Sequence, residues 1–155
     1  MEKLKVLVPV DSYIKRCIKM EKLKVLVPVD SSERSNYSLN LLENMFDKNQ
    51  VEVTLINVKE VQVNNIFLIQ QQIKKLKDKS EKIMKEAKQK IKNLGYEYEM
   101  YSCFGMPADK IVEKAEKDNF DMIVMAKSNK KGLEKIKGSV TTKVVKTSEV
   151  PVIVV

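Results

Sequence analysis

Histidine is absent from this chain of 155 residues, and cysteine occurs only twice. Without an imidazole, a Ser-His-Asp triad, a histidine general base and a histidine-ligated metal site are all excluded. Cys17 and Cys103 lie far apart in the sequence, which fits neither a zinc site nor a disulfide framework and is typical of a reducing compartment. The phosphate-binding pattern G-x-x-x-x-G-K-[S/T] is also missing, so the lysine that it supplies is not available here.

Aromatic residues are scarce, at 6%, and arginine occurs only at Arg16 and Arg34. The formal net charge of +8 would suit nucleic acid or another anionic surface. However, the lysines are dispersed along predicted helices and mixed with acidic residues, and no platform of interleaved aromatic and arginine residues occurs. We therefore interpret most of the charge as solvated helix faces and do not expect nucleic acid as a partner.

Long apolar runs are missing too, since none approaches the roughly 20 residues that a membrane span needs. The apolar run near the amino terminus, Val6 to Val10, is short, is interrupted by Pro9 and is followed by Asp11, which is not typical of a secretory signal. With 43% apolar and 32% charged residues, we expect a soluble globular protein in the cytoplasm, without a membrane partner.

A segment of twelve residues occurs twice, because Met1 to Ser12 and Met20 to Ser31 are identical. Only one copy can fill a given position in a sheet. The second copy leads into serines and a helix-like apolar pattern, whereas the first does not. We therefore predict that Lys24 to Val29 is the first strand, that residues 20–155 form the domain, and that residues 1–19 are a duplicated appendage. Our hypothesis is that this appendage adds as an extra strand to a free sheet edge or to a partner chain.

Strand-like and helix-like segments alternate along the rest of the chain. β-Branched and apolar runs predict strands, and apolar residues at steps of three and four predict helices. The predicted strands cover residues 24–29, 51–58, 96–104, 122–126 and 151–155, and the predicted helices cover residues 37–46, 66–94, a stretch from Pro107 and residues 139–146. This alternation predicts the α/β class, with parallel strands joined by right-handed crossovers. In such sheets, ligands bind outside the carboxyl ends of the strands, where the strand order reverses.

The segment from Asp121 to Val145 contains the parts of an anion site. A buried strand is followed by a loop with several lysines, and a helix is predicted to open at Gly138-Ser139. The unpaired N–H groups and the positive dipole end of a helix N-terminus favour a phosphate. An ordinary solvated connection with surface lysines explains the same spacing equally well. The lysines concerned are Lys127, Lys130, Lys131, Lys135 and Lys137, opposed only by Glu134.

Several short motifs carry a resemblance to a known family. They are V-P-V-D (27–30), G-M-P (105–107), D-M-I-V-M (121–125), G-S-V-x-x-K-V-V-K (138–146) and V-P-V-I-V-V (150–155). Over residues 20–155, the chain resembles the universal stress protein family. The resemblance implies an open parallel five-stranded sheet of order 3-2-1-4-5 with helices on both faces, the adenine-nucleotide alpha-hydrolase-like fold. It also implies a homodimer.

The ATP-binding members of this family share the loop pattern G-x-x-G-x9-G-[S/T], and here that pattern is degenerate. Ala126 and Asn129 stand at its first two glycine positions, and Gly138-Ser139 at its last. Asn129 tolerates a positive φ angle, whereas Ala126 adds a methyl group where the backbone would approach a phosphate. Eight residues instead of nine separate Asn129 from Gly138, and Gly132 partly restores freedom to this shorter loop.

The resemblance further implies that ATP or AMP, with Mg, would lie at the carboxyl ends of the first and fourth strands. The candidate residues for binding it are Pro28, Val29, Asp30, Val58, Met125, Ala126, Lys127, Asn129, Gly138, Ser139 and Val140. For Val29 and Val58, a place in the sheet core is at least as good an interpretation. Asp30 and Ser139 are also suited to capping helices. No catalytic residue and no metal ligand is identified.

Two functions remain in competition at this point. The first is a stress-response module that binds an adenine nucleotide and is not an enzyme, or at most hydrolyses ATP slowly. The second is a stress-protein homodimer that does not bind nucleotide and acts through contacts with an unknown protein partner. In both, the homodimer would form through Val152 to Val155, an uncharged apolar strand at the sheet edge. Exposed edges of that kind aggregate unless they are covered, so we predict antiparallel pairing with the same strand of a second chain.

Overall fold

Five parallel strands form the centre of the protein. The computed structural model describes residues 21–32, 34–60, 69–127 and 139–155. The strands are β1 (Leu23–Pro28), β2 (Val51–Lys59), β3 (Glu97–Phe104), β4 (Met122–Met125) and β5 (Val152–Val154), and they lie in the order β3-β2-β1-β4-β5. The predicted α/β fold and its strand order are confirmed.

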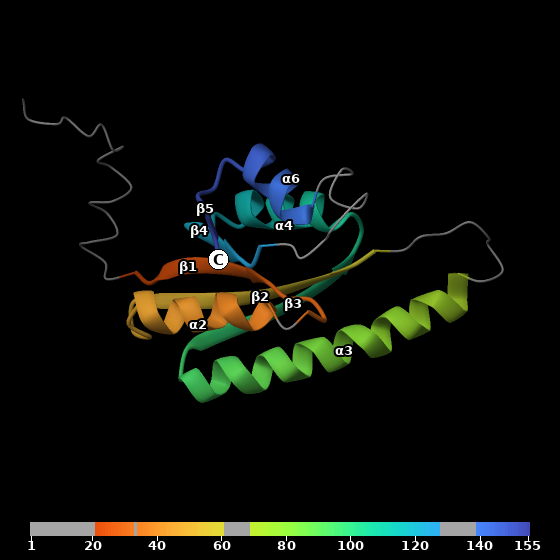
Figure 1. The fold of residues 1–155 in the computed structure, drawn as a ribbon, viewed down its shortest axis with the longest axis horizontal. Helices are drawn as coiled ribbons and strands as arrows, with labels where there is room; N and C mark the ends of the chain where they lie inside the picture. The colour runs from red at the N-terminus through yellow and green to blue at the C-terminus, as the bar shows by residue number, and fades with distance from the viewer. Residues whose placement is uncertain (1–20, 33, 61–68, 128–138) are drawn as a thin grey trace, which may run out of the picture.

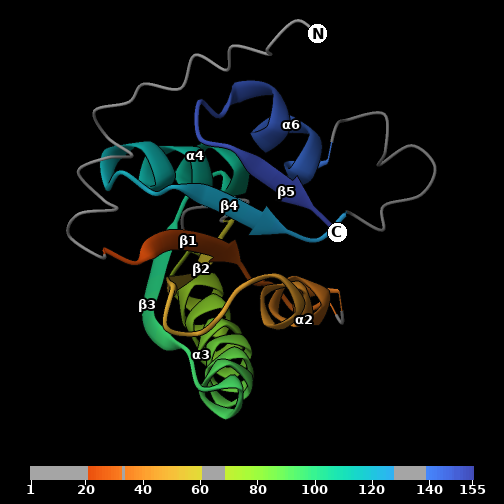
Figure 2. The same cartoon turned by 90° about the vertical axis from the view of Figure 1, so that its left-hand side faces the viewer.

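Helices cover both faces of this sheet (Figures 1 and 2). Helices α2 (Ser35–Met45) and α3 (Ile69–Leu94) lie on one face, and α4 (Pro107–Lys117) and α6 (Val140–Thr147) lie on the other. Each predicted strand and helix is present, and the boundaries that fall within the described residues agree to within two residues. The first residues of the helix predicted over 66–94 lie outside the described residues, as does the duplicated segment 1–19.

The position of β1 at the centre of the sheet explains why its sequence is apolar without alternation. Val25 and Val27 pack into the cluster formed with α2 and α3, whereas Leu26 packs into the cluster formed with α4 and α6. All three side chains are fully buried. A strand in a parallel sheet that is covered on both faces needs apolar residues at every position, and the sequence Leu-Lys-Val-Leu-Val-Pro nearly meets that need.

Helix α3 ends just before Gly95, and the next residue, Tyr96, contacts the end of α2. Gly95 has a φ of +79°, a conformation that L-residues rarely adopt and that terminates helices. Tyr96, which follows, is predicted as strand but precedes β3. Its buried hydroxyl lies 2.9 Å from the carbonyl oxygen of Leu42 and 2.7 Å from that of Phe46, at the end of α2. Burial raises the pKa of this phenol.

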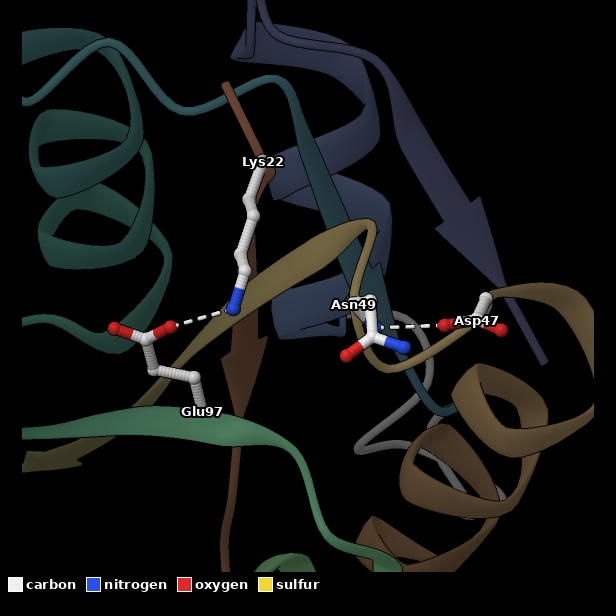
Figure 3. Close-up of polar contacts among 4 residues, drawn as sticks. All are labelled: Lys22, Asp47, Asn49 and Glu97. Carbon is white, nitrogen blue, oxygen red and sulfur yellow. Dashed lines mark hydrogen bonds and ion pairs between the residues drawn. The ribbon is translucent and has the colours of Figure 1, made fainter. Parts of the chain in front are cut away.

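Two polar contacts lie near the amino ends of the strands (Figure 3). The Nζ of Lys22, just before β1, lies 2.6 Å from Oε2 of Glu97, at the start of β3. In the turn before β2, the backbone N–H of Asn49 donates to Oδ1 of Asp47 at 2.8 Å. This edge of the sheet lies opposite the carboxyl ends, where the sequence places the candidate site.

None of the helices in the described part of the chain could span a bilayer.

Candidate functional site

The strand order reverses between β1 and β4. From β1 the chain proceeds outward through β2 to β3, and it then returns to place β4 on the other side of β1 (Figure 2). The two strands are parallel, with Val25 opposite Met122 and Leu26 opposite Ile123. Their carboxyl ends therefore meet at one edge of the sheet. The candidate residues that follow β1 and β4 are consequently brought together, as expected for the ligand-binding crevice of such a sheet.

Two side chains tie the end of β4 to the helices on either side. A guanidinium nitrogen of Arg34, just before α2, donates to the carbonyl oxygen of Lys127 at 3.4 Å. On the other side, the hydroxyl of Thr141 donates to the carbonyl oxygen of Ala126 at 3.1 Å. The starts of α2 and α6 thus both lie beside Ala126 and Lys127. Sequence reasoning noted Arg34 only as one of two arginines and did not assign it to this site.

Helix α6 begins directly after Ser139, within one residue of the predicted start. Ser139 is the N-cap, and its side-chain oxygen accepts a hydrogen bond from the backbone N–H of Thr142 at 3.1 Å. The capping role considered for this serine is therefore present. The preceding N–H groups of Val140 and Thr141 have no hydrogen-bond partner among the described residues. These groups and the dipole of α6 form the electropositive end that the anion hypothesis requires.

Asp30 shapes the turn between β1 and α2. Its Oδ1 accepts hydrogen bonds from the backbone N–H of Ser32 at 2.8 Å, from the Ser32 hydroxyl at 2.6 Å and from the Ser35 hydroxyl at 2.7 Å. The Ser35 hydroxyl in turn accepts from the backbone N–H of Asp30 at 2.9 Å. The serines expected to cap α2 thus bond to Asp30 instead, and Arg34 occupies the N-cap position. The exposed carboxylate still has a second oxygen, Oδ2, for which the structure shows no hydrogen bond among the described residues.

The apolar candidates divide between the two faces of the sheet. Val29 is 4% exposed and belongs to the core beside α2 and α3, whereas Met125 and the half-buried Val58 pack into the core beside α4. Both Val29 and Val58 thus have the place in the sheet core that the sequence analysis left open. Pro28 is half-buried at the end of β1. Asn129, Gly138 and the loop lysines after Lys127 lie outside the described residues.

A small pocket of about 120 Å³ lies under the β1–α2 turn, and sequence reasoning did not anticipate it. Val29 and Asp30 line it from the turn, Ser35 lines it from α2, and Ile83 and Ala87 line it from α3. Ligand pockets usually occupy roughly 300 Å³ or more. This pocket is therefore too small to enclose a nucleotide, but it borders the crevice on the α2 side.

A buried polar chain supports the end of β1, and sequence reasoning missed it. The side-chain amide of Asn57 donates to the carbonyl oxygen of Val29 at 2.8 Å, and the Ser80 hydroxyl donates to Oδ1 of Asn57 at 2.6 Å. Ser80 also lies 3.0 Å from the Ser102 hydroxyl, and Lys59 donates to both serines. Burial lowers the pKa of Lys59. A serine within the apolar stripe of α3 was the signal that could have revealed this chain.

No group of three or more acidic or cysteine residues that could hold a metal occurs among the described residues. A Mg²⁺ ion at this crevice would therefore depend on phosphate oxygens and water for most of its ligands, as Mg²⁺ commonly does in nucleotide sites.

Comparison with known proteins decides the family. The profile of the Universal stress protein family matches residues 23–155. The chain belongs to the universal stress protein family. Among curated members, it is 40% identical over 81 residues to universal stress protein MJ0531 of Methanocaldococcus jannaschii, covering 52% of this chain and 48% of that protein. The chain thus spans about half the length of the curated relatives that it matches.

Solved structures of universal stress proteins share the fold. UspA from Lactobacillus plantarum aligns with a TM-score of 0.75 and 20% identity, covering 87% of this chain and 98% of that one. The protein MJ0577 aligns with a TM-score of 0.71 and 29% identity, covering 85% and 94%. An Arabidopsis thaliana member with AMP bound aligns with a TM-score of 0.65 and 21% identity, covering 86% and 90%. A member in complex with cAMP aligns with a TM-score of 0.64 and 20% identity, covering 86% and 95%.

Proposed function

We propose that this universal stress protein binds an adenine nucleotide, ATP or AMP, in the crevice between the carboxyl ends of β1 and β4. One observation carries the proposal. Arg34 and Thr141 hold the starts of α2 and α6 against the backbone of Lys127 and Ala126, where the strand order reverses. A cationic side chain and a helix N-terminus therefore meet where a nucleotide would place its phosphates.

The remaining contacts follow from the positions of the candidate residues. In this proposal, the first N–H groups of α6, the Arg34 guanidinium and Lys127 would bind the phosphates. Asp30 Oδ2 would accept a hydrogen bond from a ribose hydroxyl, whereas Val29 and Met125, each 4% exposed, belong to the two cores. The solved relatives with AMP and with cAMP support a nucleotide ligand for this fold.

Binding without rapid turnover is the activity that these residues support. The chain has no histidine, and the side chains described at the crevice supply no general base other than the Asp30 carboxylate, which already accepts three hydrogen bonds. We therefore propose a sensing module in the stress response, with at most slow hydrolysis of ATP.

Thermal unfolding in the presence of MgATP, ATP alone and AMP tests this proposal. A ligand that binds only the folded state stabilises it by RT ln(1 + [L]/Kd), which is about 2.7 kcal/mol at 100 times Kd. We expect a melting temperature that rises steadily with nucleotide concentration. An unchanged melting temperature at millimolar concentrations of all three would refute nucleotide binding.

A pair of variants locates the site. Arg34→Gln removes a charged donor beside Lys127, so we expect the Kd for ATP to rise about tenfold, within the range of charged hydrogen bonds. The matched control is Lys22→Gln, which removes a cation at the opposite edge of the sheet and should leave the Kd unchanged. Equal affinities of the two variants would place the nucleotide elsewhere.

The second candidate function is a stress-protein homodimer that does not bind nucleotide and acts through protein contacts. The replaced glycines at Ala126 and Asn129 favour it. Mass spectrometry of denatured, freshly purified protein distinguishes the two. Co-purified ATP or AMP in near-stoichiometric amounts would eliminate this second function.

A further inference from the structure

We propose that residues 4–9 are a reserve copy of the central strand, able to take the place of β1 between β2 and β4. Each residue of β1, from Leu23 to Pro28, has its identical counterpart 19 positions earlier, from Leu4 to Pro9. The identity continues on both sides, from Met1 to Ser12 and from Met20 to Ser31.

The position of β1 in the sheet does not distinguish the two copies. β1 pairs with β2 over six residues and with β4 over two, through backbone groups that any sequence except proline provides. Val25, Leu26 and Val27 are fully buried in the two cores. Their counterparts have the same side chains in the same order. The first copy would therefore bury the same apolar area and form the same ladders.

The first copy also carries the groups that form the contacts at the amino end of β1. The backbone N–H of Lys24 donates to a carboxylate oxygen of Asp121 at 2.9 Å, and its carbonyl accepts from the Asp121 N–H at 2.9 Å. Lys5 offers the same backbone groups. The side chain of Lys22, which pairs with Glu97, has its counterpart in Lys3.

The chain that follows the strand is what favours the second copy. The hydroxyls of Ser32 and Ser35 both donate to Asp30. At the corresponding positions after the first copy, Tyr13 and Arg16 replace these serines, so Asp11 would lose both hydroxyl donors.

The connection to α2 adds a second preference for the same copy. Six residues, 29–34, join β1 to α2, whereas 25 residues, 10–34, would join the first copy to α2. The entropic cost of closing a loop rises only slowly with its length. The preference for β1 thus depends on one turn and one loop and not on the buried strand itself. A substitution that keeps β1 alone out of the sheet is therefore enough to reverse the preference in favour of the first copy.

Four full-length proteins test the exchange: the wild type, Leu26→Asp, Leu7→Asp and the double variant. Leu26 is fully buried beside α4 and α6, so an aspartate there blocks β1 from its place. We expect Leu7→Asp to melt like the wild type. Leu26→Asp should keep a cooperative transition at a lower temperature, because the first copy supplies Leu7. The double variant should lose its cooperative transition.

A fifth variant, Val53→Asp, is the control for a buried aspartate in a strand that has no copy. Val53 is fully buried in the neighbouring β2, and we expect this variant to unfold. Hydrogen exchange provides a direct readout, since the aspartate distinguishes the two copies by mass. In Leu26→Asp, amides of residues 4–9 should become protected and those of residues 23–28 should lose protection.

Two results would overturn the proposal. If Leu26→Asp unfolds as completely as Val53→Asp, the first copy cannot occupy the strand position. If the double variant folds as well as Leu26→Asp, the sheet tolerates the aspartate without any exchange.

Discussion

At the scale of single residues, Tyr96 makes the contact with the most direct energetic consequence. Its hydroxyl is the side-chain donor to the carbonyls of Leu42 and Phe46 at the end of α2. Tyr96→Phe should lower the free energy of unfolding by about 1–2 kcal/mol, because a buried carbonyl loses a donor that water cannot readily replace. Urea denaturation measures the change. Tyr98→Phe is the control, since the Tyr98 hydroxyl has no hydrogen bond among the described residues; its change should stay within about 0.5 kcal/mol.

Asp118 provides a pH-dependent contribution to stability. The hydrogen bond from Lys114, at 2.5 Å, lowers the pKa of this carboxyl below its usual range. Its contribution is therefore present above the unfolded pKa and is lost as pH falls through the folded pKa. Because both side chains are partly exposed, Asp118→Asn should cost no more than about 1 kcal/mol at pH 7.

The same pair of proteins, unfolded in urea at pH 7 and near pH 2, checks the sign of this effect. The difference in stability between wild type and Asp118→Asn should shrink as pH falls from 7 toward 2, because the carboxyl becomes protonated in the folded state as well as in the unfolded state. A difference of equal size at both values would mean that the ion pair is not its origin.

Residue-scale interactions were only partly accessible to sequence reasoning. The capping alternative for Ser139 describes what the structure shows, because such a contact joins residues only a few positions apart. The capping alternative for Asp30 is wrong, because its carboxylate bonds to Ser32 and Ser35 in the turn and Arg34 is the N-cap of α2. The chain from Val29 through Asn57 to Ser80 was missed, because its partners lie 28 and 23 positions apart. Ser80 looked like a weak point in an apolar stripe, whereas it is buried and hydrogen-bonded.

At the scale of secondary structure, α6 is the element whose placement matters most for the proposed site. Thr141 is 8% exposed, and its hydroxyl fixes the first turn of α6 to Ala126. Thr141→Val keeps the shape but removes this bond, so it should destabilise the protein by about 1 kcal/mol and weaken nucleotide binding.

Thr147→Val is the matched control for that variant, measured by the same denaturation and nucleotide titrations. Its hydroxyl donates to the carbonyl of Lys143 within the far end of the same helix. A loss of affinity in Thr147→Val equal to that in Thr141→Val would show that general loosening of α6, and not the link to Ala126, is responsible.

Elements were more predictable than the contacts between them. Apolar runs and helical periodicity identified each strand and helix, since these patterns reflect which faces are buried. The alternation of strands and helices indicated parallel pairing but did not determine the strand order. That order came from the resemblance carried by motifs such as Val27 to Asp30. The arrangement at the start of α2 was not predictable, because several serines there could cap the helix.

At the scale of the whole molecule, the sheet ends in two edge strands, β3 and β5. Val154 and Val155 at the β5 edge are 42% and 38% exposed, and we propose that a second copy of the chain covers them. Val154→Arg should shift the protein toward monomer, because it places two like charges near a two-fold axis. Sedimentation at micromolar concentration measures this, with Met106→Arg as the control at an exposed residue after β3. A wild-type protein that is already monomeric there would contradict the proposal.

The pairing of β1 with β4 also has a consequence for the nascent chain during translation. On a ribosome, β2 is complete at Lys59, but β4 does not begin until Met122, which is 63 residues later. At about 5–20 residues per second, synthesis of that interval takes roughly 3–13 s. Throughout those seconds, one side of β1 has no native neighbour, and nascent copies on the same messenger are close by. Chaperone occupancy should therefore peak between these two points of translation.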